Sequence, residues 1–306
     1  MNYLHDNSNL FLEIVLATGE RFGIEKSIII HDYYVWLTLK NIVKNVPNII
    51  FKGGTSLSKC YGVINRYSED IDLNCVQEEK LTKGAQKKYH HGILDSIKEL
   101  GFEITNERYF KSGFKMNRIY AKVNDESKDF KTIKVETYLY IKSYPFQTEK
   151  ATSYIYKYLK ETGKEDLIIK YDLVPYDVRV QSITRTFIDK IFAICDYYET
   201  ISTRRTSRHL YDLHKLLPHI IFDEKFYTLF SNVTLERRIG DIEKCISCNE
   251  GYDLIGTLNK IVKEDFYKND YNNVTRNLLF EEVKYEECLN SLKQIILKLK
   301  VIKWMK

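Results

Sequence analysis

The sequence lacks the two features that would place the chain in a membrane or carry it out of the cell. The longest apolar candidate for a membrane span, SIIIHDYYVWLTL, is interrupted by His31 and Asp32. The N-terminus, MNYLHDNSNLFLEI, has no basic region followed by an apolar core and a small-residue cleavage site, so we expect no secretion signal. Both absences predict a cytoplasmic protein that makes no membrane contact.

Paired cysteine motifs are also missing. The six cysteines are scattered along the chain, as expected for the reduced thiols of a cytoplasmic protein. Cys245 and Cys248 have the only metal-like CxxC spacing. Without a second pair, this spacing gives little support for zinc binding or redox chemistry.

A strong charge of one sign is absent, because the net charge of +5 is too small to indicate nucleic-acid binding by itself. The charge is uneven, however: residues 80–170 contain 19 Lys and Arg against 12 Asp and Glu, with many tyrosines between them. An ordinary solvated surface explains this composition. A basic, aromatic-rich flank would also suit a partner with a phosphate backbone.

The chain is long enough, at 306 residues, for a large core divided into two domains. Segments before about residue 171 mix helical and strand patterns, and later segments are almost entirely helical. We therefore predict an α+β protein with a mixed-sheet domain over residues 1–172 and a helical domain over residues 173–306. The best candidate for a linker is VPYDV at 174–178.

Local patterns predict the individual elements. Apolar spacing predicts helices at 9–23, 32–46, 55–62 and 86–101, and later at 184–201, 207–221 and 286–302. Aromatic and β-branched runs predict strands at 48–52, 70–76, 102–110, 114–123 and 130–141. On the Lys-rich helix at 86–101, we expect His90 and His91 to be solvated.

The stretch FKGGTSLSKCYGVINRYSEDIDLNC carries the chemistry. Asp70 and Asp72 are one residue apart on a predicted strand, so their carboxylates point to the same face, about 6–7 Å apart along the backbone. Two nearby carboxylates raise each other's pKa unless a cation lies between them. A pair of Mg²⁺ ions would relieve that repulsion and would serve in-line phosphoryl transfer.

The start of the same stretch suits an anion. Gly53 and Gly54 let the backbone approach a phosphate, and Thr55 and Ser56 present hydroxyls and amides at a helix N-terminus. A phosphate site followed by a metal site describes a nucleoside triphosphate with its magnesium. The alternative is a glycine turn followed by a surface strand with exposed acids, which would explain an Asp-x-Asp pair standing alone.

The residues resemble a known family. FKGGTSLSKC followed by RYSEDIDL is similar to the signature of the AbiEii/AbiGii nucleotidyltransferase toxins, within the DNA polymerase β-like superfamily. HDYYVWLTL resembles the family's KDYWV-type helix, with His31 in place of the usual Lys, and TFIDKIFAICDYY and SRHLYDLHKL resemble its later motifs. The match extends from about Asp32 to Leu216. It implies a nucleotidyltransferase domain followed by a helical domain that contributes to the active-site cleft.

The resemblance also implies roles for residues. Asp70 and Asp72 correspond to the metal-binding pair, Lys190 to a lysine that touches the triphosphate, and Asp212 to a late essential acid. Glu136 is the candidate for a third metal carboxylate, and His209 stands where many members have Asp. The predicted nucleotide-binding residues are Gly53, Gly54, Thr55, Ser56, Lys59, Arg66, Ser68, Lys190 and Arg208, with Arg204 and Arg205 as further anion contacts.

The residues alone leave alternatives open. Lys190 borders an apolar helix face and could keep its ammonium in water. Asp212 could pair with Arg208 one helical turn earlier. Glu136 shares a face with Lys134 and Tyr138, and could belong to the polar outer face of an amphipathic strand.

We therefore expect a Mg²⁺-dependent nucleotidyltransferase with two metal ions and a nucleoside triphosphate substrate. The acceptor would be RNA, with a tRNA 3′ end plausible, or a protein hydroxyl. The resemblance implies the toxin of a bacterial toxin–antitoxin or phage-defence pair, with a cognate antitoxin. The alternatives are a small-molecule nucleotidyltransferase that modifies an antibiotic, and a non-catalytic nucleotide- or RNA-binding protein.

Overall fold

The computed structural model describes residues 3–76, 81–109, 116–123, 132–240 and 245–300. The chain packs as two units, which are described separately. Unit 1 comprises Met1–Gly62, Ser68–Leu139 and Phe146–Val180, and unit 2 comprises Val63–Tyr67, Tyr140–Pro145 and Gln181–Lys306. No helix of the described ranges is long and apolar enough to cross a membrane.

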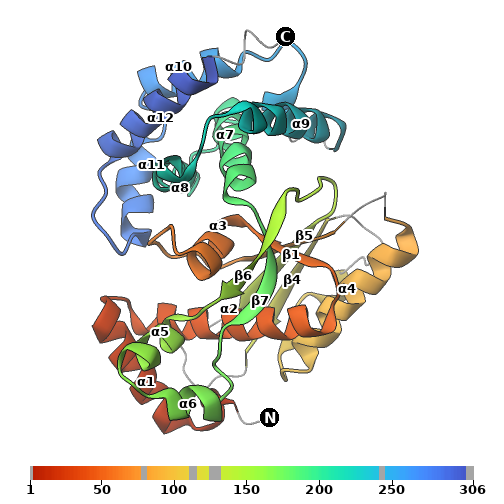
Figure 1. Ribbon diagram of the computed structural model, residues 1–306, viewed down its shortest axis with the longest axis vertical. Helices are drawn as coiled ribbons and strands as arrows, with labels where there is room; N and C mark the ends of the chain where they lie inside the picture. The colour runs from red at the N-terminus through yellow and green to blue at the C-terminus, as the bar shows by residue number, and fades with distance from the viewer. Residues whose placement is uncertain (1–2, 77–80, 110–115, 124–131, 241–244, 301–306) are drawn as a thin grey trace. The chain divides into compact units, whose positions relative to one another are not determined.

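Unit 1 is built on a mixed sheet, which has seven strands in the described ranges, in the order β3-β4-β5-β2-β1-β7-β6 (Figure 1). The central strands β1 and β2 are antiparallel, whereas β2 pairs with β5, and β1 with β7, in parallel. The strands are β1 Ile49–Lys52, β2 Ile71–Cys75, β3 Glu103–Ile104, β4 Met116–Lys122, β5 Ile133–Tyr138, β6 Phe146–Ala151 and β7 Tyr176–Gln181.

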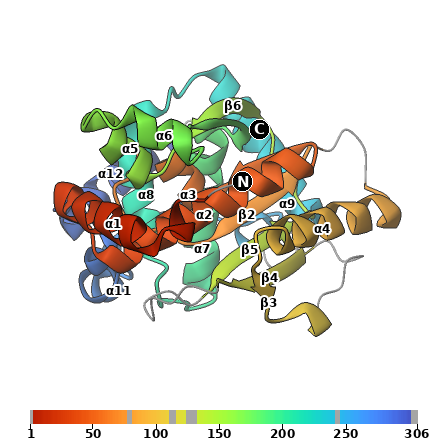
Figure 2. The same cartoon turned by 90° about the horizontal axis from the view of Figure 1, so that it is seen from below.

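Helices cover the apolar face of this sheet. Helix α2 is buried along most of its length, and it contacts α1, α4, α5 and β5 (Figures 1 and 2). The Trp36 indole nitrogen donates to the Ala151 carbonyl oxygen at 3.1 Å and so ties α2 to β6. The helical segments of unit 1 are η1 Leu4–Asp6, α1 Ser8–Phe22, α2 Lys26–Asn45, α3 Gly53–Ser56, η2 Leu57–Tyr61, α4 Lys83–Lys98, η3 Glu107–Tyr109, α5 Tyr154–Glu161 and α6 Glu165–Lys170.

Unit 2 is helical and is organised around α7, which contacts α8, α9 and α10 (Figure 1). The apolar side chains of α7 are buried. Helix α12 packs on α8 and α10 and completes this core. The helical segments are α7 Ile183–Glu199, α8 Arg208–Leu216, η4 Leu217–His219, α9 Glu224–Gly240, η5 Ile246–Cys248, α10 Leu254–Lys263, α11 Lys268–Asn273, η6 Thr275–Leu278 and α12 Tyr285–Leu299.

The predicted α+β class is confirmed, with three corrections. The linker predicted at 174–178 was wrong, because Tyr176 begins strand β7, in which Val178 and Val180 turn into the core. His90 is buried rather than solvated, and its Nε2 lies 2.9 Å from the Thr137 hydroxyl under the sheet. Of the strand predicted at 102–110, Glu103–Ile104 forms β3 and Glu107–Tyr109 forms a 3-10 helix. The outer ends of the strands predicted at 114–123 and 130–141 lie outside the described residues.

Candidate active site

Four charged side chains form a row across the middle of the unit 1 sheet. The strand register pairs Lys52 of β1 with Asp72 of β2. Asp72 also pairs with Glu136 of β5, which in turn lies opposite Arg118 of β4. Directly paired residues point to the same face of a sheet, and the neighbours of these residues along β2, β4 and β5 are buried under the opposite face. We call these four residues the charged row.

Two further charged residues, Asp70 and Lys134, lie next to the charged row. Asp70 directly precedes β2, and the Lys134 Nζ lies 3.2 Å from Asp70 Oδ2 and 3.1 Å from Glu136 Oε2. The Arg118 Nε lies 2.5 Å from the other oxygen of Glu136, Oε1. Both oxygens of Glu136 therefore contact a cation, and Lys134 links two carboxylates.

Burial and neighbouring carboxylates raise the pKa of both aspartates. Burial, with smaller contributions from Asp70 and Glu136 and against the opposing charge of Lys52, raises the pKa of Asp72 to about 6. Burial also raises the pKa of Asp70, with Lys134 opposing. Burial alone would lower the pKa of Lys134, but Asp70 and Glu136 outweigh it, so that this pKa is raised. These shifts show that the carboxylates lie close enough to affect one another, with the Lys134 ammonium between Asp70 and Glu136.

The glycine turn lies directly against Asp72. Gly53 has a φ of +79°, and a Cβ added to it would lie 2.2 Å from Asp72 Oδ2. Only glycine suits both the left-handed backbone and this close approach. The hydroxyl oxygens of Thr55 and Ser68 are 2.9 Å apart, and the Ser56 hydroxyl donates to the Gly53 carbonyl oxygen at 2.8 Å. These hydroxyls therefore hold the turn together from within, and Gly54 completes its backbone.

Lys59 connects two of the motifs inside unit 1. Its side chain is 3% exposed, and its Nζ lies 2.6 Å from Asp32 Oδ1. Asp32 Oδ2 accepts from the Tyr154 backbone N–H at 2.9 Å, at the start of α5. The Lys59 ammonium is thus directed at Asp32 of the HDYYV motif, where it holds three segments together; a nucleotide contact for it stays a prediction.

Unit 2 contains a second cluster, centred on the fully buried Asp212. Arg66 forms a two-point ion pair with it, with Nε to Oδ1 and Nη2 to Oδ2 both at 2.7 Å. The Lys190 Nζ lies 2.5 Å from Oδ2. The Lys190 ammonium therefore does not lie in water. The cations in contact with Asp212 are Lys190 and Arg66, not Arg208 as considered from the sequence. We call Arg66, Lys190, Arg208 and Asp212 the cationic cluster.

The cluster carries excess positive charge. Burial opposes the ionisation of Asp212, but Arg66 and Lys190 hold its pKa far below the ordinary range. Burial, followed by the charges of Lys190 and Arg208, holds the pKa of His209 well below its ordinary value, so this imidazole is neutral at pH 7. Arg66 and Lys190 contact Asp212, and Arg208 is close enough to lower the pKa of Lys190, so the cluster has more cations than carboxylates and attracts an anion.

Arg208 has a buried guanidinium nitrogen to spare. Its Nε has no hydrogen-bond partner among the described residues. Arg204, in contrast, is exposed, and the Arg205 backbone N–H donates to Asp270 Oδ1 at 2.8 Å. Of the three predicted arginines, the structure brings Arg208 into the cationic cluster.

The sequence reasoning missed how the C-terminal part of the chain holds Arg66. The Tyr67 backbone N–H donates to the Leu278 carbonyl oxygen at 2.8 Å, and the Phe280 N–H donates to that of Asn65 at 3.0 Å. These pairs place Arg66 opposite Leu279 in a short bridge. Such pairing between distant segments has no local sequence signal, although Arg66 itself lies within the recognised motif.

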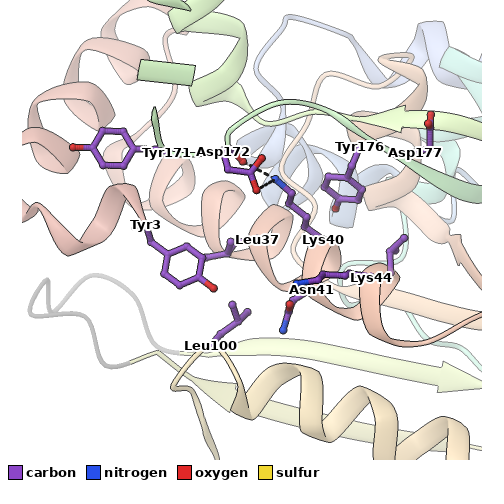
Figure 3. A pocket seen from close by; sticks show the side chains of 11 residues that line it. Tyr3, Leu37, Lys40, Asn41, Lys44, Leu100, Tyr171, Asp172, Tyr176 and Asp177 are labelled. Atoms are coloured by element: carbon purple, nitrogen blue, oxygen red, sulfur yellow. Dashed lines mark hydrogen bonds and ion pairs between the residues drawn. The ribbon is translucent and has the colours of Figure 1, made fainter. Parts of the chain in front are cut away.

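A cavity of about 400 Å³ lies elsewhere in unit 1, and none of the predicted site residues lines it (Figure 3). Figure 3 shows Tyr3, Leu37 and Tyr176 around it, beside an ion pair in which Lys40 Nζ lies 2.8 Å from Asp172 Oδ2. No group of three or more His, Cys, Asp or Glu side chains in the described ranges is arranged as a ready metal site. In the charged row, the cations on Glu136 occupy the oxygens that a metal would need.

Comparison with known proteins assigns the family. Residues 41–292 match the family described as nucleotidyl transferase AbiEii toxin, type IV toxin–antitoxin system. The chain belongs to the AbiEii nucleotidyltransferase toxin family. It is therefore an enzyme, a nucleotidyltransferase toxin whose system includes an antitoxin and whose substrate is a nucleoside triphosphate. The family resemblance predicted from the motifs is confirmed, and the match extends well beyond Leu216.

A solved structure has the same fold. MenT4, a nucleotidyltransferase toxin from Mycobacterium tuberculosis H37Rv, is similar with a TM-score of 0.64 at 15% sequence identity, covering 94% of this chain and 89% of MenT4. At this identity the likeness supports the fold alone. No curated protein sequence matches the chain.

Proposed function

We propose that this AbiEii family member transfers a nucleotide from a nucleoside triphosphate to an RNA hydroxyl in a divalent-metal-dependent reaction, with a tRNA 3′ end as the candidate acceptor. The observation that carries the proposal is the meeting of Asp70, Asp72 and Glu136 on one sheet face beside the Gly53 turn. A sheet with a purely structural role gains nothing from this concentration of partly buried carboxylates, because Glu136 and burial raise the pKa of both Asp70 and Asp72.

The donor set fits magnesium. Carboxylate oxygens are the ligands that Mg²⁺ prefers, and Asp70, Asp72 and Glu136 would supply them. When bound, a pair of Mg²⁺ ions would lower the pKa of the acceptor hydroxyl and neutralise the charge on the departing pyrophosphate. Asp72 fills the space beside Gly53, whereas Gly54, the next residue of the turn, has no side chain to keep a phosphate oxygen away from its backbone.

The cationic cluster suits the triphosphate. Lys190, Arg66 and Arg208 together exceed the charge of Asp212, and the spare Nε of Arg208 is a donor suited to a phosphate oxygen. A general base works best with a pKa near the operating pH, whereas the pKa of Asp212 is held far lower. We therefore assign Asp212 the role of orienting Lys190 and Arg66.

Two observations bear on the alternatives. A small-molecule enzyme would need a compact acidic acceptor pocket, and the flank at residues 80–170 has a basic surplus instead. A non-catalytic binder would have no need of the destabilising carboxylates. A protein hydroxyl remains the rival acceptor, and the experiment below separates it from RNA.

The test is a transfer assay with each of the four α-³²P-labelled triphosphates, Mg²⁺ and total cellular RNA. We expect label in RNA with the unchanged protein, none with Asp72→Asn, and full transfer with Glu103→Gln, an exposed acid on β3 of the same sheet. Label in protein alone would overturn the RNA acceptor. Absence of label in every fraction, or growth arrest that persists with Asp72→Asn, would overturn catalysis as the basis of toxicity.

A further inference from the structure

Lys134 occupies a position that the function does not explain. Its ammonium lies between two of the three carboxylates, 3.2 Å from Asp70 Oδ2 and 3.1 Å from Glu136 Oε2. We propose that Lys134 is an internal cation that holds these carboxylates in the metal-free protein and is displaced when a divalent ion binds. The inference rests on the proposed function, because it concerns the same carboxylates.

Protein cations already neutralise most of the negative charge at the site. Lys52, Arg118 and Lys134 face the carboxylates of Asp70, Asp72 and Glu136, and Glu69 adds a further negative charge near Asp70. A divalent ion that binds oxygens already held by a cation repels that cation at contact distance. The cation in contact with those oxygens therefore has to move.

Geometry selects Lys134 as the cation that leaves. In the described residues it is the cation in contact with both Asp70 and Glu136, so it occupies oxygens of two carboxylates that would hold the metal. Arg118 contacts the opposite oxygen of Glu136, which leaves Oε2 for the metal after Lys134 has moved. The Lys134 side chain is 30% exposed, so its four-carbon stem can swing toward solvent without unpacking the core.

If a metal ion displaces Lys134, removal of Lys134 should lower the thermal stability of the metal-free protein and raise its affinity for the metal. Without Lys134, the carboxylates repel each other in the metal-free protein, so its thermal midpoint in EDTA falls. The same loss removes the competitor, so a divalent ion binds more tightly. If Lys134 only braced the sheet, its removal would lower both the thermal stability and the metal affinity, because loosened ligands bind metal less well.

The test measures Mn²⁺ binding by electron paramagnetic resonance titration of the metal-free full chain. We expect Lys134→Met to lower the Kd for Mn²⁺ about tenfold, and Lys134→Gln to do the same if the Met variant is insoluble. The matched control is Lys122→Met, an exposed lysine on the adjoining strand β4, whose Kd stays within about twofold of that of the wild type. Thermal midpoints in EDTA are recorded for each variant.

The results distinguish a failure of the Lys134 proposal from a failure of the proposed metal site. An unchanged or weaker Kd in Lys134→Met, with Asp70→Asn abolishing the wild-type binding, overturns the displacement by Lys134 and leaves the metal site standing. Wild-type protein that binds no Mn²⁺, or binding that survives Asp70→Asn, overturns the metal site and this inference together.

Discussion

Arg66 and Asp212 are 146 residues apart in the chain and form a two-point ion pair with both nitrogen–oxygen distances at 2.7 Å. Both side chains are almost fully buried, at 2% and 0% exposure. A buried pair of this kind is weak support for stability as a whole, but the loss of one partner leaves an uncompensated charge in the core. The pair therefore fixes residues 63–67 to the helical core of unit 2.

Arg66→Met should lower the free energy of unfolding by about 3–5 kcal/mol, because Lys190 is then the one cation of the described residues that still contacts Asp212. The measurement is the urea midpoint followed by circular dichroism. Arg21→Met is the control, since Arg21 pairs with Glu161 at the surface of unit 1 and should change the stability by less than about 1 kcal/mol. Equal effects of the two substitutions would contradict the buried role.

Gly53→Ala should abolish transfer, whereas Gly62→Ala should leave it intact. Both glycines have a positive φ, so both substitutions introduce backbone strain of about 1–3 kcal/mol. A Cβ at Gly53 also meets Asp72 Oδ2 at 2.2 Å, while a Cβ at Gly62 meets nothing within 4 Å. Nucleotide transfer by the two variants is compared at equal concentrations of folded protein. An active Gly53→Ala variant would refute the contact between the glycine turn and the Asp72 carboxylate.

The sequence predicted the parts of the site that depend on local pattern. Spacing placed Asp70 and Asp72 together, and the family resemblance proposed Glu136 as a third carboxylate, which the register brings opposite Asp72. The partners of Arg66 and Lys134 were not predicted, because they depend on pairing between segments far apart in the chain. Strands β6 and β7 were also missed, because β6, FQTEKA, is mostly polar and Pro175 beside β7 resembled a linker signal.

Lys59→Met should destabilise the protein without changing the KM for the triphosphate. The Lys59 ammonium contacts Asp32 by its carboxylate at 2.6 Å and by its carbonyl oxygen at 3.0 Å, so its removal should cost about 3–5 kcal/mol. Urea unfolding and steady-state kinetics measure the two effects. Lys44→Met, at an exposed position near the end of α2, should change neither. A higher KM in folded Lys59→Met protein would instead support the nucleotide contact predicted from the sequence.

Arg208→Met should weaken nucleotide binding with little loss of stability. No described residue accepts a hydrogen bond from its buried Nε, so the substitution leaves no protein partner unpaired. A lost charge-assisted bond to a phosphate corresponds to a Kd about ten- to a hundredfold higher. Calorimetric titration with a nucleoside triphosphate tests this, with the exposed Arg204→Met as the matched control. Equal affinities for the two variants would exclude Arg208 from the anion site.

His31 should make the protein sensitive to acid. Burial lowers the pKa of its imidazole to about 4, whereas the unfolded chain has a value near 6.5. Between these values the unfolded state binds more protons, so the contribution is complete above pH 7 and is lost as the pH falls toward 4. This difference corresponds to about 2 kcal/mol between pH 7 and pH 5.

His31→Gln removes this titration, so its stability relative to the wild type should rise as the pH falls from 7 to 5. Urea midpoints across that range measure the difference. The raised pKa of Asp72 favours the folded state at low pH in both proteins, and its contribution therefore cancels in the comparison. His91→Gln, at an exposed position on α4, should follow the wild type throughout. A constant difference between His31→Gln and the wild type would mean that the His31 imidazole takes up its proton in the folded protein as readily as in the unfolded chain.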